Sequence, residues 1–361
     1  MKDFSKKLLG WHALYGRRGM PWQNLKDPYQ VWLSEIMLQQ TQVITVKDRY
    51  IQFLQRFPEI TDLARATLDD VMTLWAGLGY YTRARNLHAC AKIIVDQYAG
   101  KFPQDAVTLC TLPGIGMSTA AAIAAFCYGQ KISILDANVK RLLARVFGIE
   151  QDLNKSSVHQ ELWLKAQSLV PTQSANMPNY TQALMDFGAT VCTPKKPKCE
   201  SCIYQDSCIA YIQDKVDVIP IKIQKTKSKV VQSEMLFIVA KDQVLFELRQ
   251  TNGIWGGLWS LPESPWQEAS ARKIVPLKLS CEDYSSIPSD TIQLAFKKSK
   301  ILAPRKHVFT HRVLYFQIRI LVIEKPFAVD TKKFQWVNVN DYENLGMPTP
   351  VKQWLNDYSA L

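Results

Sequence analysis

Residues 112–141 read LPGIGMSTAAAIAAFCYGQKISILDANVKR, and this stretch decides the fold. Its first five residues lie between two segments with helical character. Gly114 and Gly116 permit a tight turn and a close approach of the backbone to a ligand. The helix that follows starts with exposed N–H groups, which hold a phosphate without reading base sequence. We therefore predict a phosphate-binding hairpin between two helices, and the alternative is an ordinary helix–helix turn.

The same stretch ends with a carboxylate, Asp136, directly before a second helical segment. The helix dipole and the free N–H groups at a helix start favour the ionised form of an aspartate in this place. The alternative interpretation is an ordinary N-cap, because aspartate is common at that position.

A second carboxylate, Glu35, lies upstream in an apolar row of the segment VWLSEIML, residues 31–38. Its neighbours at i−4, i−3 and i+3 are Val31, Trp32 and Leu38. A carboxyl in such a row is either salt-bridged or has a raised pKa. One protonated and one ionised carboxyl form the pair that acid-assisted cleavage of a glycosidic bond needs. The spacing along the chain leaves open whether Glu35 and Asp136 meet in space.

Four of the eight cysteines lie close together with the spacing C-x6-C-x2-C-x5-C: Cys192, Cys199, Cys202 and Cys208. Four thiolates at this spacing hold one tetrahedral metal ion or the four irons of a cubane cluster. Zinc ribbons usually supply two C-x2-C pairs and this chain has one, which favours iron–sulfur over zinc. The loop 193–198 carries three lysines, so it either contacts phosphates or is a solvated loop.

The 361 residues carry 44 Lys and Arg against 32 Asp and Glu, a net charge of +12. Such an excess favours a polyanionic partner, with nucleic acid ahead of a membrane surface, over a basic protein without a special partner. The most apolar stretch, 119–126, is far shorter than the roughly 20 residues that span a bilayer. The first residues also lack the continuous apolar core of a signal segment. We expect no membrane partner.

Two domains joined by a linker are expected, an all-helical one followed by a smaller α/β one. Residues 1–213 have periodic apolar segments at 63–75, 83–98, 119–126, 139–147 and 157–169. Residues 214–229 have little to bury and hold a basic run, Lys222, Lys225, Lys227 and Lys229. Residues 230–361 contain strand-like runs at 235–239, 244–248, 313–323 and 334–339.

Together these motifs resemble the adenine DNA glycosylase family of the helix-hairpin-helix superfamily, and the resemblance covers nearly the whole chain. Besides the hairpin, Asp136 and the cysteines, it rests on the runs PW (21–22), WLSEIMLQQTQ (32–42) and GLGYY (77–81). It implies a glycosylase of base excision repair that removes adenine mispaired with 8-oxoguanine or guanine. The substrate would be double-stranded DNA, and the adenine must be flipped out of the stack before its bond is hydrolysed.

The resemblance also implies roles for single residues. Glu35 would donate a proton to the adenine and then help to activate water, Asp136 would support the cationic sugar, and the four cysteines would hold one [4Fe-4S] cluster. Gln40 and Tyr80 would enter the DNA helix near the lesion, and Thr41 would approach the oxidised guanine. The adenine pocket would be lined by Arg18, Trp22 and Gln182.

Three of these residues have plainer alternatives. Trp22 can be a core residue and Tyr80 a packing residue. Gln182 can be half of a capping box with Asn179.

Position 118 separates two related classes of enzyme. Relatives of endonuclease III carry a lysine there, which forms a Schiff base with the sugar and makes them lyases. Ser118 cannot form that imine, so we predict a monofunctional glycosylase. We also expect Ser118 to contact the DNA together with the hairpin glycines. The endonuclease III pattern also lacks a carboxylate at the place of Glu35.

The C-terminal domain resembles the family's Nudix-like module that checks for 8-oxoguanine. The run WGGLW, residues 255–259, begins the Nudix pattern, which in hydrolases continues G-x5-E-x7-R-E-x2-E-E. Gly257 and Glu263 fit its first step, but residues 271–276 read ARKIVP and lack the metal-binding carboxylates. We therefore expect this domain to bind and not to hydrolyse. Residues 309–311, FTH, resemble the family's FSH recognition loop, with Thr310 keeping the hydroxyl and adding a methyl.

Three other functions are alternatives at this stage. A bifunctional enzyme of the endonuclease III type is disfavoured by Ser118 and Glu35. A non-catalytic iron–sulfur protein that senses DNA damage is disfavoured by the presence of both carboxylates. A nucleotide pyrophosphohydrolase is disfavoured by the broken Nudix pattern. We further expect a monomer that works in the bacterial cytoplasm.

Overall fold

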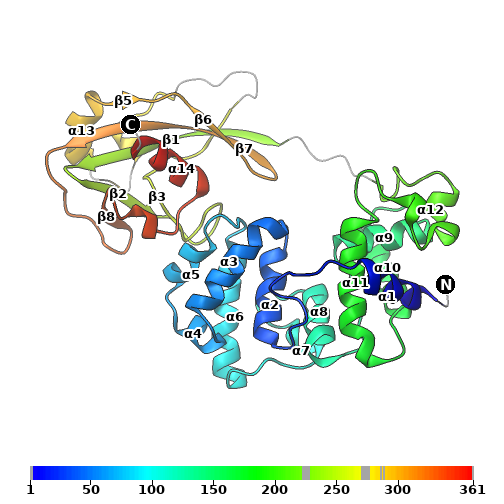
Figure 1. Cartoon of the computed structure of the whole chain (residues 1–361). Coiled ribbons are helices and arrows are strands. Elements are labelled where there is room, and N and C mark those ends of the chain that lie inside the picture. Colours follow the sequence, from blue (N-terminus) through cyan, green and yellow to red (C-terminus); the bar gives the residue numbers. More distant parts are fainter. Residues whose placement is uncertain (1–2, 222–227, 270–276, 285–286, 288, 360–361) are drawn as a thin grey trace. The chain divides into compact units, whose positions relative to one another are not determined.

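The structure is a computed structural model that describes residues 3–221, 228–269, 277–284, 287 and 289–359 (Figure 1). The chain divides into two compact units. Unit 1 comprises Met1–Ala66 and Arg85–Gln224, and unit 2 comprises Thr67–Ala84 and Lys225–Leu361. In this division the segment Thr67–Ala84, which lies within the predicted helical domain 1–213, groups with the C-terminal residues.

Unit 1 is helical in its described residues, as the sequence predicts. Its α-helices are α1 (Phe4–Tyr15), α2 (Pro28–Leu38), α3 (Val43–Arg56), α4 (Ile60–Arg65), α6 (Thr82–Tyr98), α7 (Ala106–Leu109), α8 (Met117–Tyr128), α9 (Ala137–Phe147), α10 (Ser156–Ser168), α11 (Met177–Thr190) and α12 (Ile209–Ile212). The first turn of α6, up to Ala84, belongs to unit 2. Its short 3-10 helices are η1 (Ser174–Asn176), η2 (Cys199–Ser201) and η3 (Gln205–Ser207). Within the described part of the chain, no helix has the length and apolar character to cross a membrane.

The helix predicted over 63–75 is wrong in one detail, because α4 ends at Arg65 and a new helix, α5 (Leu68–Trp75), begins in unit 2. Thr67 is the N-cap of α5, and its Oγ1 accepts a bond from the backbone N–H of Asp70 (3.1 Å). The Asp70 carboxylate in turn accepts a bond from the backbone N–H of Thr67 (3.2 Å). This reciprocal capping box satisfies the first N–H groups of α5 and so starts a separate helix.

Helix α8, which follows the hairpin, lies at the centre of unit 1. Its residues 120–125 are 0% exposed, and all except Ile123 are alanines. Such small side chains allow a close approach of neighbouring helices, and α8 packs against both α2 and α11. The core of unit 1 therefore fixes the helix that carries Glu35 next to the helix that begins at the hairpin.

Unit 2 is built on a mixed sheet of eight strands in the described residues. The strands are β1 (Lys229–Ala240), β2 (Gln243–Leu248), β3 (Trp259–Ser260), β4 (Gln267–Glu268), β5 (Lys300–Ile301), β6 (Arg305–Val308), β7 (Arg312–Ile323) and β8 (Phe334–Asn338). β1 and β7 pair in parallel from Lys229↔Arg312 to Ala240↔Ile323, and the other pairs are antiparallel. The main path runs β3-β2-β1-β7-β5.

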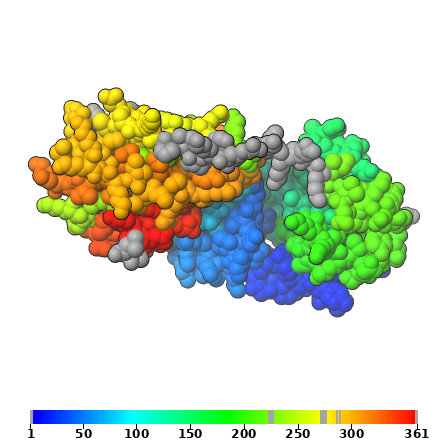
Figure 2. Space-filling model, turned by 90° about the horizontal axis from the view of Figure 1, so that it is seen from above, coloured from blue at the N-terminus to red at the C-terminus, as the bar shows by residue number. Residues whose placement is uncertain are grey.

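Besides α5, the described helices of unit 2 are α13 (Ser289–Lys297), α14 (Thr349–Ser359), η4 (Cys281–Asp283) and η5 (Tyr342–Asn344). In the space-filling view the C-terminal residues, coloured from yellow through orange to red, form one continuous body (Figure 2). The predicted class, a helical domain followed by a smaller α/β domain, is confirmed.

Helix α5 belongs to unit 2 through specific contacts. The indole N–H of Trp259 donates to Asp69 Oδ1 (3.1 Å), and the Thr73 hydroxyl donates to the carbonyl of Asn344 (3.3 Å). Gly346 lies so close to α5 that a Cβ added to it would be 3.1 Å from backbone atoms of Met72 and Thr73. A side chain at position 346 would therefore displace α5.

The predicted linker 214–229 has structure at both of its described ends. Ile219 is 1% exposed in the core of unit 1, and its carbonyl accepts a bond from Arg145 Nε (2.9 Å). Lys229 is the first residue of β1, which starts earlier than the predicted 235. The interpretation that this segment has little to bury is therefore wrong at Ile219. The lysines Lys222, Lys225 and Lys227 lie outside the described residues.

Candidate functional site

Glu35 is held in the second half of α2 by a well-defined helix start. Asp27 caps that helix and accepts a bond from the backbone N–H of Tyr29 (2.9 Å), with Pro28 as the first helical residue. Burial, and to a smaller extent the charge of Asp136, raise the pKa of Glu35 to about 8. At neutral pH this carboxyl therefore carries a proton that it can donate. The pKa shift also places Glu35 and Asp136 within electrostatic reach of each other.

Asp136 is the N-cap of α9, as the plainer interpretation predicted. Its Oδ1 accepts a bond from the backbone N–H of Val139 (2.8 Å), and its Oδ2 accepts one from Asn138 Nδ2 (3.3 Å). The positive end of the α9 dipole stabilises an anion in this position. Asp136 is thus a cap whose side chain has two protein donors, and this geometry is compatible with the predicted role beside Glu35.

Ser118 is bonded within the protein. Its Oγ accepts a bond from the backbone N–H of Leu135 (3.1 Å), the residue directly before Asp136. This bond ties the first turn of α8 to the segment that carries the aspartate. The sequence places Ser118 at the DNA, and the structure adds a role in holding the Asp136 segment.

The hairpin glycines have different surroundings. Gly114 has φ +77°, and an added Cβ would lie 2.8 Å from Asn86 Cβ, so both conformation and space require glycine there. Gly116 is the exposed N-cap of α8 at φ −84°, and no heavy atom would lie within 4 Å of an added Cβ. The space before the α8 N-terminus is therefore open, as a phosphate-binding helix start requires.

Gln40 and Thr41 lie in the turn between α2 and α3. Gln40 is exposed and has φ +57°, a left-handed conformation that is uncommon for a residue with a side chain. The backbone N–H of Thr41 donates to the carbonyl of Leu38 (3.3 Å), which closes the turn. The turn thus leaves Gln40 exposed shortly after the helix that holds Glu35.

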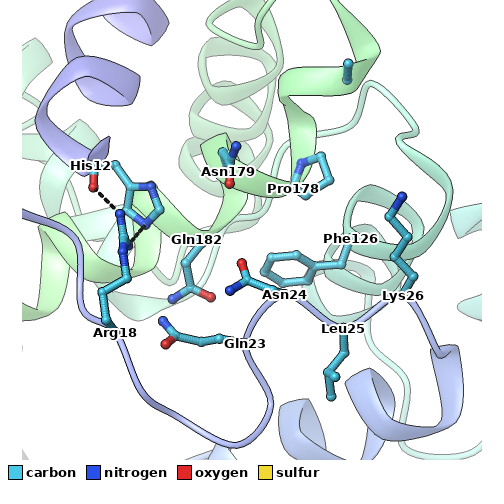
Figure 3. Close-up of a pocket in the computed structure, with 11 residues that line it drawn as sticks. His12, Arg18, Gln23, Asn24, Leu25, Lys26, Phe126, Pro178, Asn179 and Gln182 are labelled. Atoms are coloured by element: carbon cyan, nitrogen blue, oxygen red, sulfur yellow. Dashed lines mark hydrogen bonds between the residues drawn. The ribbon is translucent and has the colours of Figure 1, made fainter. Parts of the chain in front are cut away.

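Two of the three residues expected around an adenine line one cavity of about 260 Å³, shown in Figure 3. Arg18 and Gln182 are among its lining residues, together with His12, Asn24 and Phe126. Arg18 Nη2 donates to the carbonyl of His12 (2.8 Å), which holds the guanidinium at the edge of the cavity.

Trp22 is not among the residues that line this cavity. It is 9% exposed and packs edge-on against Tyr50, with 5.4 Å between ring centroids. The structure places Trp22 as the core residue of the plainer alternative. Gln182 donates to Asp186 Oδ1 (2.9 Å), a partner other than the Asn179 of the capping-box alternative.

Asp186 is the residue beneath this cavity that sequence reasoning missed. It is 0% exposed and accepts bonds from the backbone N–H (2.9 Å) and the Nε (2.8 Å) of Arg17 as well as from Gln182. Burial acts to raise its pKa, but hydrogen bonds from His12 and Gln182 and the charge of Arg17 hold that pKa below its usual value. The available signal was its i+4 spacing from Gln182 on one helix face.

Tyr80 and Thr310, which are 230 residues apart in sequence, meet in unit 2. Their hydroxyl oxygens are 2.9 Å apart and share a hydrogen bond. Tyr80 is 46% exposed and has φ +49°, and Thr310 is exposed at the tip of the hairpin between β6 and β7. The two residues that the resemblance places near the oxidised guanine therefore form one exposed pair.

The four clustered cysteines line one small cavity with Arg145. Arg145 Nη1 lies 3.5 Å from Cys192 Sγ, and the backbone N–H of Tyr204 donates to Cys202 Sγ (3.5 Å). Four sulfurs around one cavity, two of them with an N–H donor within reach, fit the ligand set of an iron–sulfur cluster. Within the described residues, no three His, Cys, Asp or Glu side chains are arranged to hold a single metal ion.

Of the Nudix pattern, residues 271–276 lie outside the described residues.

Two family models match the chain. Residues 33–167 match the HhH-GPD superfamily of base excision DNA repair proteins, and residues 234–357 match the NUDIX domain. An adenine DNA glycosylase of Buchnera aphidicola subsp. Baizongia pistaciae is 36% identical over 352 residues, which cover 96% of this chain and 94% of that protein. The human adenine DNA glycosylase is 30% identical over 413 residues, which cover 99% of this chain and 74% of that protein.

Solved structures match the helical part. A thermostable thymine-DNA glycosylase is 31% identical with a TM-score of 0.54, covering 59% of this chain and 96% of that one. An endonuclease III in a non-covalent DNA complex is 18% identical with a TM-score of 0.50, which supports the same fold.

Proposed function

The chain belongs to the adenine DNA glycosylase family, and we propose that it hydrolyses the N-glycosidic bond of adenine mispaired with 8-oxoguanine or guanine in double-stranded DNA. The observation that carries this proposal is the pair of carboxyls in unit 1. Glu35 has a pKa near 8 and lies within electrostatic reach of Asp136 at the N-terminus of α9. One proton donor and one fixed anion are what acid-assisted glycosidic cleavage needs.

In the first step, the protonated Glu35 donates its proton to a ring nitrogen of the flipped adenine. The bond between the base and C1′ then breaks, and its electron pair leaves with the base. Positive charge develops on the sugar, and Asp136 stabilises that charge without moving, because its oxygens are already held by Val139 and Asn138. In the second step, the ionised Glu35 accepts a proton from the water that attacks C1′, which restores the acid.

Ser118 supports a monofunctional reaction. A lyase needs an amine that attacks C1′ and forms an imine, and a serine hydroxyl cannot do so. The Ser118 Oγ also accepts the N–H of Leu135, so this position serves to hold the Asp136 segment. Water is then the nucleophile, and the product is an abasic site that breaks on treatment with alkali.

DNA contacts are assigned on chemistry and exposure. The net charge of +12 favours a polyanion, and the open N-terminus of α8 after Gly116 offers N–H groups to a phosphate. Gln40 and Tyr80, both exposed and both at positive φ, would enter the base stack. Thr41 and Thr310 would approach the base opposite adenine. Arg18 and Gln182 would contact the flipped adenine.

One [4Fe-4S] cluster is proposed at Cys192, Cys199, Cys202 and Cys208. When bound, the cluster supplies a rigid cross-link among these residues rather than a reacting group. The loop 193–198 with its three lysines lies between the first two ligands, so the cross-link would fix those charges for phosphate contact. Arg141 Nε donates to the carbonyl of Cys192 (2.8 Å), which connects this loop to α9.

The test is single-turnover release of adenine from labelled duplexes with adenine opposite 8-oxoguanine, guanine or thymine, each with and without alkali. We expect release opposite the two guanines only, with strand breaks that appear after alkali. The matched control is Glu35→Gln, which keeps the size of the side chain and cannot act as the acid. Its rate should fall by roughly 10²–10⁴-fold. Breaks without alkali would support the bifunctional alternative, and tight binding without release would support a damage sensor.

A further inference from the structure

Glu263 occupies the first glutamate position of the Nudix pattern, and its carboxylate is fully engaged by protein donors. Its Oε1 accepts bonds from the Ser233 hydroxyl (2.6 Å) and the Trp266 indole N–H (2.7 Å). Its Oε2 pairs with the Arg249 guanidinium. The side chain is 6% exposed. A carboxylate with these three donors acts as an internal anchor.

The anchored groups lead into a cluster of aromatic rings. Trp266 lies 6.1 Å from Trp255 and 6.0 Å from Phe309, measured between ring centroids. Trp255 also contacts Phe309 at 5.1 Å, and the Arg249 guanidinium lies over the Trp255 ring at 5.6 Å. Arg249 and Trp266 both donate to Glu263. Arg249 lies over one ring of this cluster and Trp266 is another of its rings, so Glu263 orients the cluster through both.

The cluster ends at the exposed hairpin tip. Phe309 directly precedes Thr310, and its backbone N–H donates to the carbonyl of Arg312 (2.8 Å). His307, on the strand before the tip, packs edge-on against Phe309 at 4.6 Å. The rings thus hold the base of a turn whose exposed residue, Thr310, shares a hydrogen bond with Tyr80.

We propose that Glu263 is a positioning residue that, through Arg249 and Trp266, sets the place of Thr310 for reading the base opposite adenine. The inference rests on the proposed function. In this chain the first glutamate of the Nudix pattern is the ionic anchor of the loop that carries Thr310. It acts through other residues and does not touch the DNA.

The physical reason lies in the charge of the anchor. A neutral amide of the same size at position 263 would direct its NH₂ group or a weaker acceptor at Arg249, which would leave a half-buried guanidinium poorly compensated. Arg249 would then turn toward solvent, and the Trp255 and Trp266 rings would lose the two groups that orient them. The tip would remain folded through its backbone bonds, but Thr310 would no longer occupy one place.

The experiment compares the full-length wild type with Glu263→Gln and with a matched control, Glu268→Gln, whose side chain is 83% exposed. Adenine release and equilibrium binding are measured on duplexes with 8-oxoguanine or guanine opposite adenine, and thermal melting is recorded for each variant. Thr310→Val keeps the shape of the side chain and removes its hydroxyl. It shows how far the preference for 8-oxoguanine over guanine falls when residue 310 no longer contributes. Trp266→Phe removes only the indole donor.

We expect Glu263→Gln to lower the preference for 8-oxoguanine over guanine about tenfold, close to the effect of Thr310→Val, as the loss of one oriented hydrogen bond predicts. Trp266→Phe should give a smaller change in the same direction, and Glu268→Gln none. An unchanged preference in Glu263→Gln, or an equal loss on both duplexes with lower melting, would overturn the inference. A wild type that releases no adenine would instead contradict the proposed function.

Discussion

The two units hold glutamates in different surroundings, and the surroundings decide what each carboxyl can do. On α2, no cation of the described residues pairs with Glu35, and burial raises its pKa to about 8. In unit 2, Glu234 is 0% exposed but accepts a bond from Arg319 Nε (2.5 Å). Gln317 and the Tyr284 hydroxyl donate to the same carboxylate (2.5 and 2.8 Å). An apolar surrounding makes a proton carrier, whereas a guanidinium makes a fixed anion.

This contrast indicates why one chain holds both a reacting carboxyl and structural ones. A proton donor at neutral pH must be destabilised as an anion, so Glu35 adds reactivity at a cost in stability. Glu234 and Glu263 have arginine partners and serve the architecture of unit 2.

The largest effect is expected from Asp136→Asn, which removes the anion beside Glu35. Asparagine is as good an N-cap as aspartate, so α9 should keep its start. We expect adenine release to fall roughly 10²–10³-fold, because the developing sugar cation loses its fixed negative charge. Single-turnover kinetics measure the loss, and duplex binding and melting should stay near the wild-type values. Turnover close to wild type would contradict the role of Asp136.

A large loss of stability is expected from Glu234→Ala. It leaves the Arg319 guanidinium buried without its carboxylate, and breaking such a pair costs about 3–5 kcal/mol. Thermal or urea unfolding of the full chain measures the change. The comparison variant is Glu268→Ala on the exposed pair with Lys229, which should change stability by less than about 1 kcal/mol. Equal effects of the two substitutions would mean that burial of the pair does not matter.

Glu35→Gln should change stability in the opposite direction. Its pKa is raised from 4.5 to about 8 by folding, so stability from this group is complete below pH 4.5 and falls as the pH rises toward 8. At pH 7 the wild type has lost up to roughly 3 kcal/mol that an amide does not lose. Melting of the variant should exceed that of the wild type at pH 7 and match it near pH 4.5. Lower melting of the variant at pH 7 would indicate that Glu35 is a structural anion like Glu234.

Features that depend on local sequence could be predicted. The hairpin glycines, the helix cap at Asp136 and the cysteine spacing each follow from neighbours a few residues apart. The apolar row around Glu35 predicted a salt bridge or a raised pKa, and the structure has the raised pKa. The helix break at Thr67 was missed, although its capping box with Asp70 is also local and could have been found.

Features that depend on the fold could not be predicted from spacing. The coupling of Glu35 to Asp136 and the bond between Tyr80 and Thr310 join residues that are distant in sequence. Asp186 gave little signal, because a single aspartate on a helix is usually exposed, and only packing reveals its contact with Arg17. Ile219 lies in a segment with the composition of a linker, and only packing reveals its burial in the core of unit 1.

The most direct test of the central claim is the pH dependence of kcat/KM for adenine release, since this parameter reports the ionisations of the free enzyme. If Glu35 acts as a protonated acid, the rate should stay high up to its pKa of about 8. Above that value it should fall about tenfold per pH unit, as the acid loses its proton. A rate that stays constant or rises between pH 8 and about 10 would contradict the assignment of Glu35 as the proton donor.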